Sequence, residues 1–114
     1  MKLTKAARLR RRGEFLQTQQ RGRRLHSGDV LVLALASGAA RPRIGITVSS
    51  KVGNAVERNR IRRWVREAWR ALPGGLPAVD LVVIARPAAR EMGLVGARRA
   101  LEAARAALLR GGAA

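Results

Sequence analysis

The sequence predicts an α/β domain in which helices pack on a mixed sheet, with the elements in the order α-β-β-α-β-α. Runs at 29–37 and 43–51 are typical of strands. Segments 54–72 and 91–110 repeat apolar residues at the spacing of helices that cover a sheet. Because this order combines both kinds of element and the length suits one domain, we expect a single domain over 1–114.

The N-terminal part is predicted to hold one short helix, in the stretch "RGEFLQTQQRG". Phe15, Leu16 and Gln19 lie at helical spacing, and Gly22 is placed to end the helix.

Three strands are predicted from apolar patterns. "DVLVLALAS" is a continuous apolar run of the kind found in buried strands, and "VDLVVIA" is a second. "RIGITVSSK" alternates, so that its aliphatic residues face one side of the sheet. "SGAARP", between "DVLVLALAS" and "RIGITVSSK", has turn chemistry. We therefore expect these two runs to pair as an antiparallel hairpin. A short strand near Arg24 is a further candidate.

The helix over 54–72 has the clearest local signals. Asn54 is a good N-cap, and Glu57, three residues later, can complete a capping box. Pro and Gly at 73–75 end this helix, and the last helix, over 91–110, carries an amphipathic stripe.

Spacing of about 100° per residue divides the 54–72 helix into two sides. The apolar side consists of Ile61, Val65, Ala68 and Leu72, with Trp64 and Trp69 at its edges, where we expect both to pack in the core. The opposite side consists of Arg62, Arg63, Arg66, Arg70 and Asn59, and Arg58 and Arg60 flank the apolar stripe.

This charge pattern predicts a polyanionic partner. The chain has 24 Lys and Arg against 7 Asp and Glu, a net charge of +17. Four arginines of the helix, at 58, 62, 66 and 70, repeat at i, i+4, where like charges destabilise a helix. A solvated face would mix both signs, and a membrane-surface helix would need an apolar face that the sheet does not use. We therefore expect nucleic acid.

RNA is favoured over DNA. A strand, and no helix-turn-helix partner, leads into the basic helix. The polar side of that strand would present Arg43, Thr47, Ser49 and Lys51 beside the helix, in a groove suited to a single strand or an irregular RNA surface.

Other classes are excluded by composition. The chain has no cysteine and a single histidine, His26, so we expect no metal site and no thiol-based or histidine-based catalytic residues. Asp80 is expected to start a strand. No signal peptide or membrane span is visible, which predicts a cytoplasmic protein, and residues 1–7 and 111–114 are expected to be flexible.

The stretch "RIGITVSSKVGNAVERNRIRRWVREAWR", at 43–70, closely resembles the signature of the bacterial ribonuclease P protein subunit. In that family a strand leads through Gly-x-Ala-Val to Arg-Asn-Arg and a basic helix. "RLRRRGEF", "DVLVLAL" and "DLVVIAR" fall in the family's order and spacing.

The resemblance implies an α+β sandwich, α-β-β-β-α-β-α, with a mixed central sheet and a left-handed β-α-β crossover, similar to the second domain of ribosomal protein S5. It implies a subunit that assists a catalytic RNA in removing the 5′ leader from precursor tRNA. The RNA would hold the Mg²⁺ ions, and the protein alone would be inactive, with no protein-bound cofactor and no obligate protein partner. A ribosomal or general RNA-binding protein is the alternative.

The resemblance also implies site residues. Contacts to the catalytic RNA are expected from Arg58, Asn59, Arg60, Arg62, Arg63 and Arg66. The precursor-tRNA leader cleft is expected to include Phe15, Arg43, Thr47, Ser49 and Lys51. Secondary basic contacts are expected from Arg8, Arg10, Arg12, Arg21 and Arg24, and a general basic surface from Arg98, Arg99, Arg105 and Arg110.

The first helix departs from the family pattern. Gln17 and Gln19 stand where a second aromatic residue is usual, and the chain has no tyrosine. Since base stacking contributes about 1–3 kcal/mol per base, the cleft should depend more on hydrogen bonds and charge. Phe15 has two interpretations, as a leader contact or as a core anchor of its helix. Ser50 and Arg62 replace the usual lysines.

Overall fold

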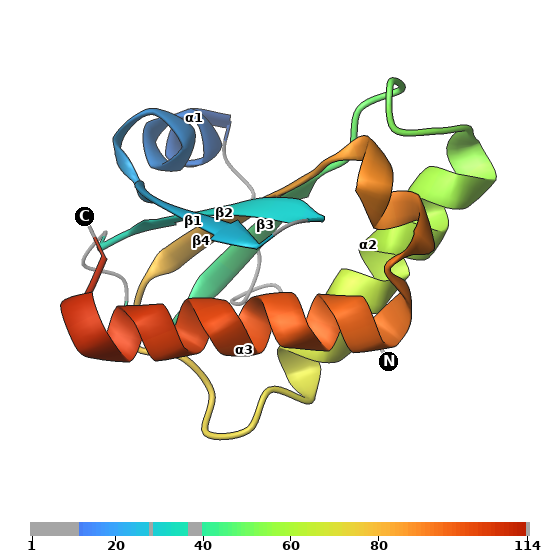
Figure 1. Cartoon of the computed structure of the whole chain (residues 1–114). Helices are drawn as coiled ribbons and strands as arrows, with labels where there is room; N and C mark the ends of the chain where they lie inside the picture. Colours follow the sequence, from blue (N-terminus) through green and yellow to red (C-terminus); the bar gives the residue numbers. More distant parts are fainter. Residues whose placement is uncertain (1–11, 28, 37–39, 114) are drawn as a thin grey trace.

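A four-stranded sheet with helices on both faces forms the molecule (Figure 1). The computed structural model describes residues 12–27, 29–36 and 40–113. In chain order the elements are α1 (Arg12–Arg21), β1 (Arg23–Ser27), β2 (Val30–Leu35), β3 (Arg43–Thr47), α2 (Ala55–Arg70), β4 (Asp80–Ala85), the 3-10 helix η2 (Pro87–Glu91) and α3 (Gly93–Gly111). The order α-β-β-β-α-β-α is confirmed, and β1 is the short strand considered near Arg24.

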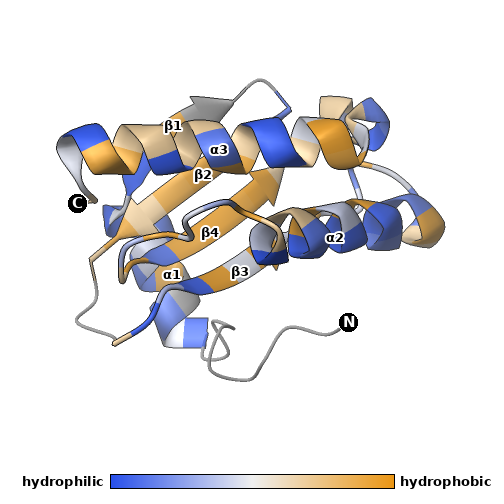
Figure 2. Ribbon diagram, turned by 90° about the horizontal axis from the view of Figure 1, so that it is seen from below, coloured by the Kyte–Doolittle hydropathy of each residue, from blue (hydrophilic) through white to orange (hydrophobic). Residues whose placement is uncertain are grey.

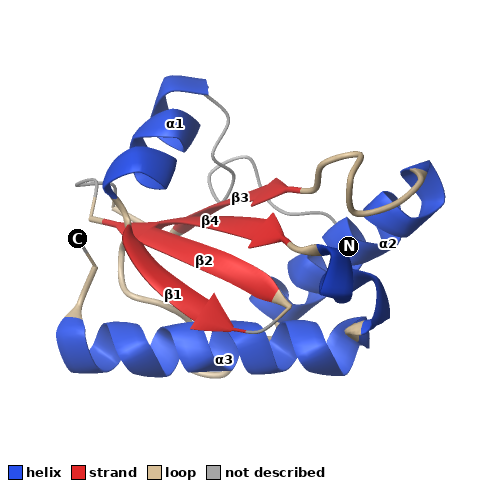
Figure 3. Ribbon diagram, turned by 45° about the horizontal axis from the view of Figure 1, so that its top comes forward, coloured by secondary structure: helices blue, strands red, loops and turns tan. Residues whose placement is uncertain are grey.

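The strands lie side by side in the order β1-β2-β4-β3 (Figure 3). β2 is antiparallel to both β1 and β4, and β3 is parallel to β4, so the sheet is mixed as predicted. The predicted hairpin between β2 and β3 is wrong, because β4 lies between them. The hairpin is instead β1–β2, in which Ser27 pairs with Val30. The handedness of the crossover from β3 through α2 to β4 stays a prediction.

The apolar content of the strands explains this order. β2 and β4 are apolar on both faces, and all their residues are buried except Leu35 and Ile84, which are half-buried. Such strands are stable in the middle of a sheet with both faces covered. β3 alternates Ile44 and Ile46 with polar or small residues and therefore takes an edge.

α2 and α3 cover one face of the sheet and enclose the main core. Figure 2 shows β2 and β4 as apolar and α2 as largely hydrophilic on the side away from the sheet. The core side chains on this face include Val32, Ala34, Ile44, Leu81, Val83, Ile61, Val65, Leu101 and Leu108. In the part of the chain that the structure describes, no helix is both long and apolar enough to cross a membrane.

α1 crosses the opposite face at the end where β3 and β4 begin. Leu33 and Val82 are buried on this face. The next row of the register, farther from α1, holds Leu31, Ile84 and Thr47, of which the last two are only half-buried. We call these three residues the open row. Within residues 12–27, 29–36 and 40–113, one face is thus closed by two helices, while the other is covered by α1 at one end.

Arginines hold the C-terminal helix and the loop before β4. The Arg23 Nη1 atom donates to the carbonyl oxygens of Ala107 at 3.1 Å and Gly112 at 2.8 Å, which satisfies acceptors at the end of α3. The Arg105 Nε atom donates to the carbonyl of Gly75 at 2.7 Å. Arg105 therefore has a structural contact beyond the general basic surface predicted for it, and Gly112, predicted to be flexible, is a hydrogen-bond acceptor in the fold.

Candidate nucleic-acid interface

The start of α2 is fixed by a complete capping box. The Asn54 side chain accepts from the Glu57 backbone N–H at 2.9 Å, and the Glu57 carboxylate accepts from the Asn54 N–H at 2.9 Å. The predicted cap is confirmed. It fixes where the helix begins, and so which side of the helix each later residue occupies.

The apolar stripe of α2 faces the core. Ile61, Val65 and Ala68 are buried, with 0%, 2% and 1% of their surface exposed. Trp64 and Trp69 are partly buried against the same core, which confirms the packing expected for them. The tryptophan rings are therefore used for folding, and the polar side of the helix faces outward.

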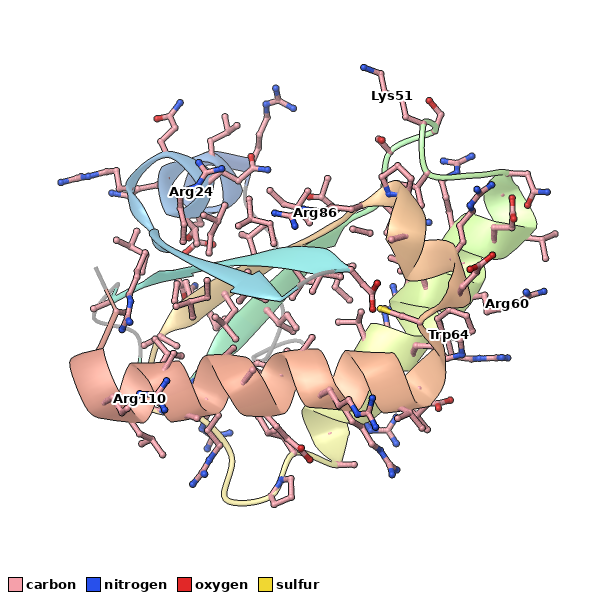
Figure 4. All side chains as sticks on the ribbon, in the orientation of Figure 1. Arg24, Lys51, Arg60, Trp64, Arg86 and Arg110 are labelled. Carbon is pink, nitrogen blue, oxygen red and sulfur yellow. The ribbon has the colours of Figure 1, made fainter. Side chains whose placement is uncertain are left out.

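The outward side of α2 forms a basic surface. Asn59, Arg60, Arg63 and Arg66 are exposed and, together with Val56, enclose an open hollow of about 570 Å³. Figure 4 shows Arg60 pointing away from the body of the molecule. Arg58 and Arg62 are half-buried on one shoulder of the helix. We use the name basic belt for the residues that share this surface: Arg58, Asn59, Arg60, Arg62, Arg63 and Arg66.

Little negative charge offsets the basic belt within α2. Of the two glutamates of the helix, Glu57 is engaged in the cap, and Glu67 lies 4.0 Å from Arg63 in an exposed pair that contributes at most about 1 kcal/mol. Arg62 donates to the Asn59 side chain at 3.1 Å, which orients both groups. The Arg58 Nε atom is enclosed without a hydrogen-bond partner. Most of the positive charge of the belt is thus uncompensated within α2.

The second predicted surface lies on the α1 side of the sheet. Thr47 ends β3 in the open row, and Ser49 and Lys51 are exposed in the turn that follows, which is closed by a hydrogen bond from Val52 N–H to Ser49 carbonyl at 3.0 Å. Lys51 extends from the tip of this turn (Figure 4). Three of the predicted cleft residues therefore lie together, between the sheet and the start of α2.

Arg43 lies at the opposite end of β3, where two carboxylates bind it. Its Nε and Nη2 atoms donate to the two carboxylate oxygens of Asp80 at 2.8 Å each, and Nη1 donates to Glu14 at 2.6 Å. The Asp80 carboxylate is the main cause that raises the pKa of Arg43 above its ordinary value. Arg43 thus differs from the other predicted cleft residues, because its charge is compensated within the fold.

Comparison with known proteins identifies the family. The model of the family Ribonuclease P matches residues 3–108. The ribonuclease P protein component of Gluconacetobacter diazotrophicus is 47% identical over 89 residues, which cover 75% of this chain and 77% of that protein.

The chain belongs to the ribonuclease P protein family. The solved ribonuclease P protein of Thermotoga maritima has a TM-score of 0.75 and 35% identity, covering 86% of this chain and 94% of that one. A mutant of the Staphylococcus aureus ribonuclease P protein, described as defective in mRNA degradation activity, has a TM-score of 0.81 and 31% identity, covering 93% and 90%. The predicted fold class and family are therefore confirmed.

Of the remaining predicted contacts, those that the structure describes lie around α1. Arg12 and Arg21 are exposed at its two ends, and Arg24 is exposed on β1 on the same side of the sheet (Figure 4). Gln17 is exposed and Gln19 half-buried. Arg8, Arg10 and the side chains of Phe15 and His26 lie outside what the structure describes, so both interpretations of Phe15 remain predictions.

Two acidic residues at this site, Glu14 and Asp80, were not predicted to have any role in it. Asp80 starts β4, as expected, but its pairing with Arg43 joins residues 37 positions apart in the sequence. The sequence feature that could have indicated this pair is the single acidic residue at the start of an apolar strand, because such a charge is rarely buried without a partner.

Replacing Gly53 with Ala should destabilise the protein by about 1 kcal/mol, because it disturbs the capping box. A Cβ atom at Gly53 would lie 2.6 Å from the Glu57 carboxylate and would displace it from Asn54. Chemical denaturation measures the change in unfolding free energy. Gly13→Ala is the control, since a Cβ there meets nothing within 4 Å. Equal stability of the two variants would contradict a role for Gly53 in the cap.

Proposed function

We propose that this chain binds the catalytic RNA of ribonuclease P through the basic belt and thereby assists removal of the 5′ leader from precursor tRNA. Membership of the family makes it part of an endoribonuclease complex that processes tRNA. The observation that carries the proposal is the outward side of α2, where Arg60, Arg63 and Arg66 are exposed around one hollow. Guanidinium groups bind phosphates with paired, directional hydrogen bonds.

The leader is proposed to lie along the open row, beside α1. Thr47, Ser49 and Lys51 offer two hydroxyl groups and one ammonium group to a strand there, and Leu31 and Ile84 supply an apolar floor. This combination supports binding of a single strand by charge and hydrogen bonds. Arg24 lies on the same side and extends the positive potential (Figure 4).

The proposal assigns the chemistry to the RNA. Mg²⁺ ions held mainly by the RNA would activate the attacking water, and the protein would contribute positive charge and substrate position, with no protein-bound cofactor. We propose that it does so in the cytoplasm without an obligate protein partner.

Reconstitution tests the proposal. The purified protein alone should not cleave precursor tRNA, and its cognate RNA alone should cleave poorly at low, physiological Mg²⁺. The two together should cleave efficiently, because the protein supplies cations near the phosphates of leader and ribozyme. If the protein adds nothing to the RNA at any Mg²⁺ concentration, the proposal is wrong. RNA that co-purifies with the tagged protein also separates this function from general RNA binding, which would bring down ribosomal RNA.

A second candidate activity comes from the S. aureus relative, whose mutant is described as defective in mRNA degradation activity. The proposal that the protein alone is inactive therefore needs a separate test. Incubating the protein with mRNA in the absence of the ribonuclease P RNA should leave the mRNA intact. Degradation that persists through further purification would assign an RNA-independent activity to this chain.

A further inference from the structure

A partly buried cluster of three charged residues joins α1 to the sheet. Glu14 is in the first turn of α1, Arg43 is the first residue of β3, and Asp80 is the first residue of β4. Arg43 donates to both carboxylates at 2.6–2.8 Å through three different nitrogens. The geometry is that of strong, charge-assisted hydrogen bonds.

The two halves of the cluster differ in burial. The Asp80 side chain is 3% exposed, whereas those of Arg43 and Glu14 are 22% and 30% exposed. Asp80 and Arg43 share two hydrogen bonds on neighbouring strands and form the fixed half. Glu14 is held by one hydrogen bond and belongs to a different element, so it can separate from Arg43 without opening the sheet.

The other end of α1 is attached by close packing. Thr18 is fully buried, and a Cβ at Gly22 would collide with the Thr18 carbonyl oxygen and lie 3.1 Å from the backbone nitrogen of Ala34. The end of α1 therefore cannot move away from β2 without breaking these contacts. Leu16, in the middle of the helix, is 38% exposed and contributes less. Among the side chains of α1 that the structure describes, Glu14 then attaches the first turn to the sheet through Arg43.

We propose that Glu14 is a positioning residue for the leader, because its contact with Arg43 sets the height of α1 above the sheet, beside the open row. This inference rests on the proposed binding of the leader in that place. Asp80 and Arg43 serve as a rigid base, and Glu14 fixes α1 to it. The distance between α1 and the turn that carries Lys51 is the width available to the RNA leader, and it therefore depends on this contact.

The direction in which leader affinity changes when the negative charge of Glu14 is removed distinguishes a positioning role from general electrostatics. Glu14→Gln removes a negative charge on the same side of the sheet as the proposed path of a polyanion, so that electrostatics alone would strengthen leader binding. Positioning predicts the opposite, since α1 would lose its fixed height. Glu102→Gln is the matched control, because Glu102 is exposed on α3, on the other face of the sheet, and makes the same change in net charge.

The experiment compares two affinities of the reconstituted holoenzyme, for precursor tRNA and for tRNA without a leader. Their ratio measures the leader's contribution. Glu14→Gln should lower this ratio roughly threefold to tenfold, while affinity for the catalytic RNA stays unchanged. Glu102→Gln should leave the ratio as in the original protein, and Glu14→Asp, which keeps a carboxylate, should recover part of the loss.

Amide hydrogen exchange of the free protein gives a readout that does not depend on RNA. In Glu14→Gln the amides of α1 should exchange roughly threefold to tenfold faster, with β2 and β4 unchanged. Unchanged exchange in α1 would overturn the inference whatever the leader affinity shows, because the contact would then not position the helix.

The outcomes also separate this inference from the proposed function. If the original protein shows no preference for precursor tRNA over tRNA without a leader, the leader site itself is wrong, and the inference fails with it. If the original protein shows the preference and Glu14→Gln keeps or increases it, the leader site stands and the positioning role is wrong.

Discussion

Arg43→Ala should lower the free energy of unfolding by about 3–5 kcal/mol, because it leaves the carboxylate of Asp80 buried without its partner. Asp80 is 3% exposed, and Arg43 supplies a hydrogen bond to each of its oxygens. The attraction within such a pair is offset by the cost of removing both charges from water, so that losing one partner is more harmful than losing both. Thermal or urea denaturation, followed by circular dichroism, measures the change.

Two further variants test whether the loss of stability comes from the unpaired Asp80 carboxylate and not from the loss of one positive charge. Arg41→Ala, two residues earlier at an exposed position, removes the same charge and should change stability by no more than about 0.5 kcal/mol. The double variant Arg43→Met with Asp80→Leu replaces the buried pair with apolar groups and should regain much of the stability that Arg43→Ala loses. If Arg43→Ala is as stable as Arg41→Ala, the cluster does not stabilise the fold.

Replacing Arg60 and Arg63 together with Ala should weaken binding to the catalytic RNA roughly a hundredfold, since each is expected to lose a charge-assisted contact with a phosphate. Both side chains are exposed on the basic belt, so the fold should be unaffected. The slope of log affinity against log salt should fall by about 1.5, the value for two lost phosphate contacts. Filter binding or fluorescence titration across a salt series gives both quantities.

The control for this pair is Arg99→Ala with Arg110→Ala. Both residues are exposed on α3, and the double variant removes the same two charges. Its effect on affinity should be small, and Figure 4 shows Arg110 at the end of the molecule away from Arg60. Equal losses in the two double variants would mean that total charge drives binding and that the belt has no special position.

The basic belt could be predicted from sequence because its determinants are local. Asn54, Glu57 and the residues that they orient lie within a few turns of one helix, so a regular spacing of about 100° per residue places each arginine. The buried side, with Ile61 and Val65, is defined by the same spacing. Neither prediction required knowledge of distant parts of the chain.

The strand order and the charged cluster could not be predicted in the same way. Turn chemistry at 37–42 suggested a hairpin, but the apolar faces of β2 and β4 are buried more completely when these strands are neighbours. The partners Glu14, Arg43 and Asp80 come from three separate elements, and their meeting depends on that strand order. A pairing decided by tertiary packing leaves little trace in a local pattern.

The capping box at Asn54 has a consequence for the length of the chain. One residue inserted between Glu57 and Arg58 would rotate all later residues of α2 by about 100°, which would turn Ile61 toward water and guanidinium groups toward the core. An insertion in the turn before Asn54 would leave the rotation of the helix unchanged, since the helix would still begin at the same cap. Evolutionary gain or loss of a residue should therefore disturb the orientation of α2 less in the turn before the cap than within the helix.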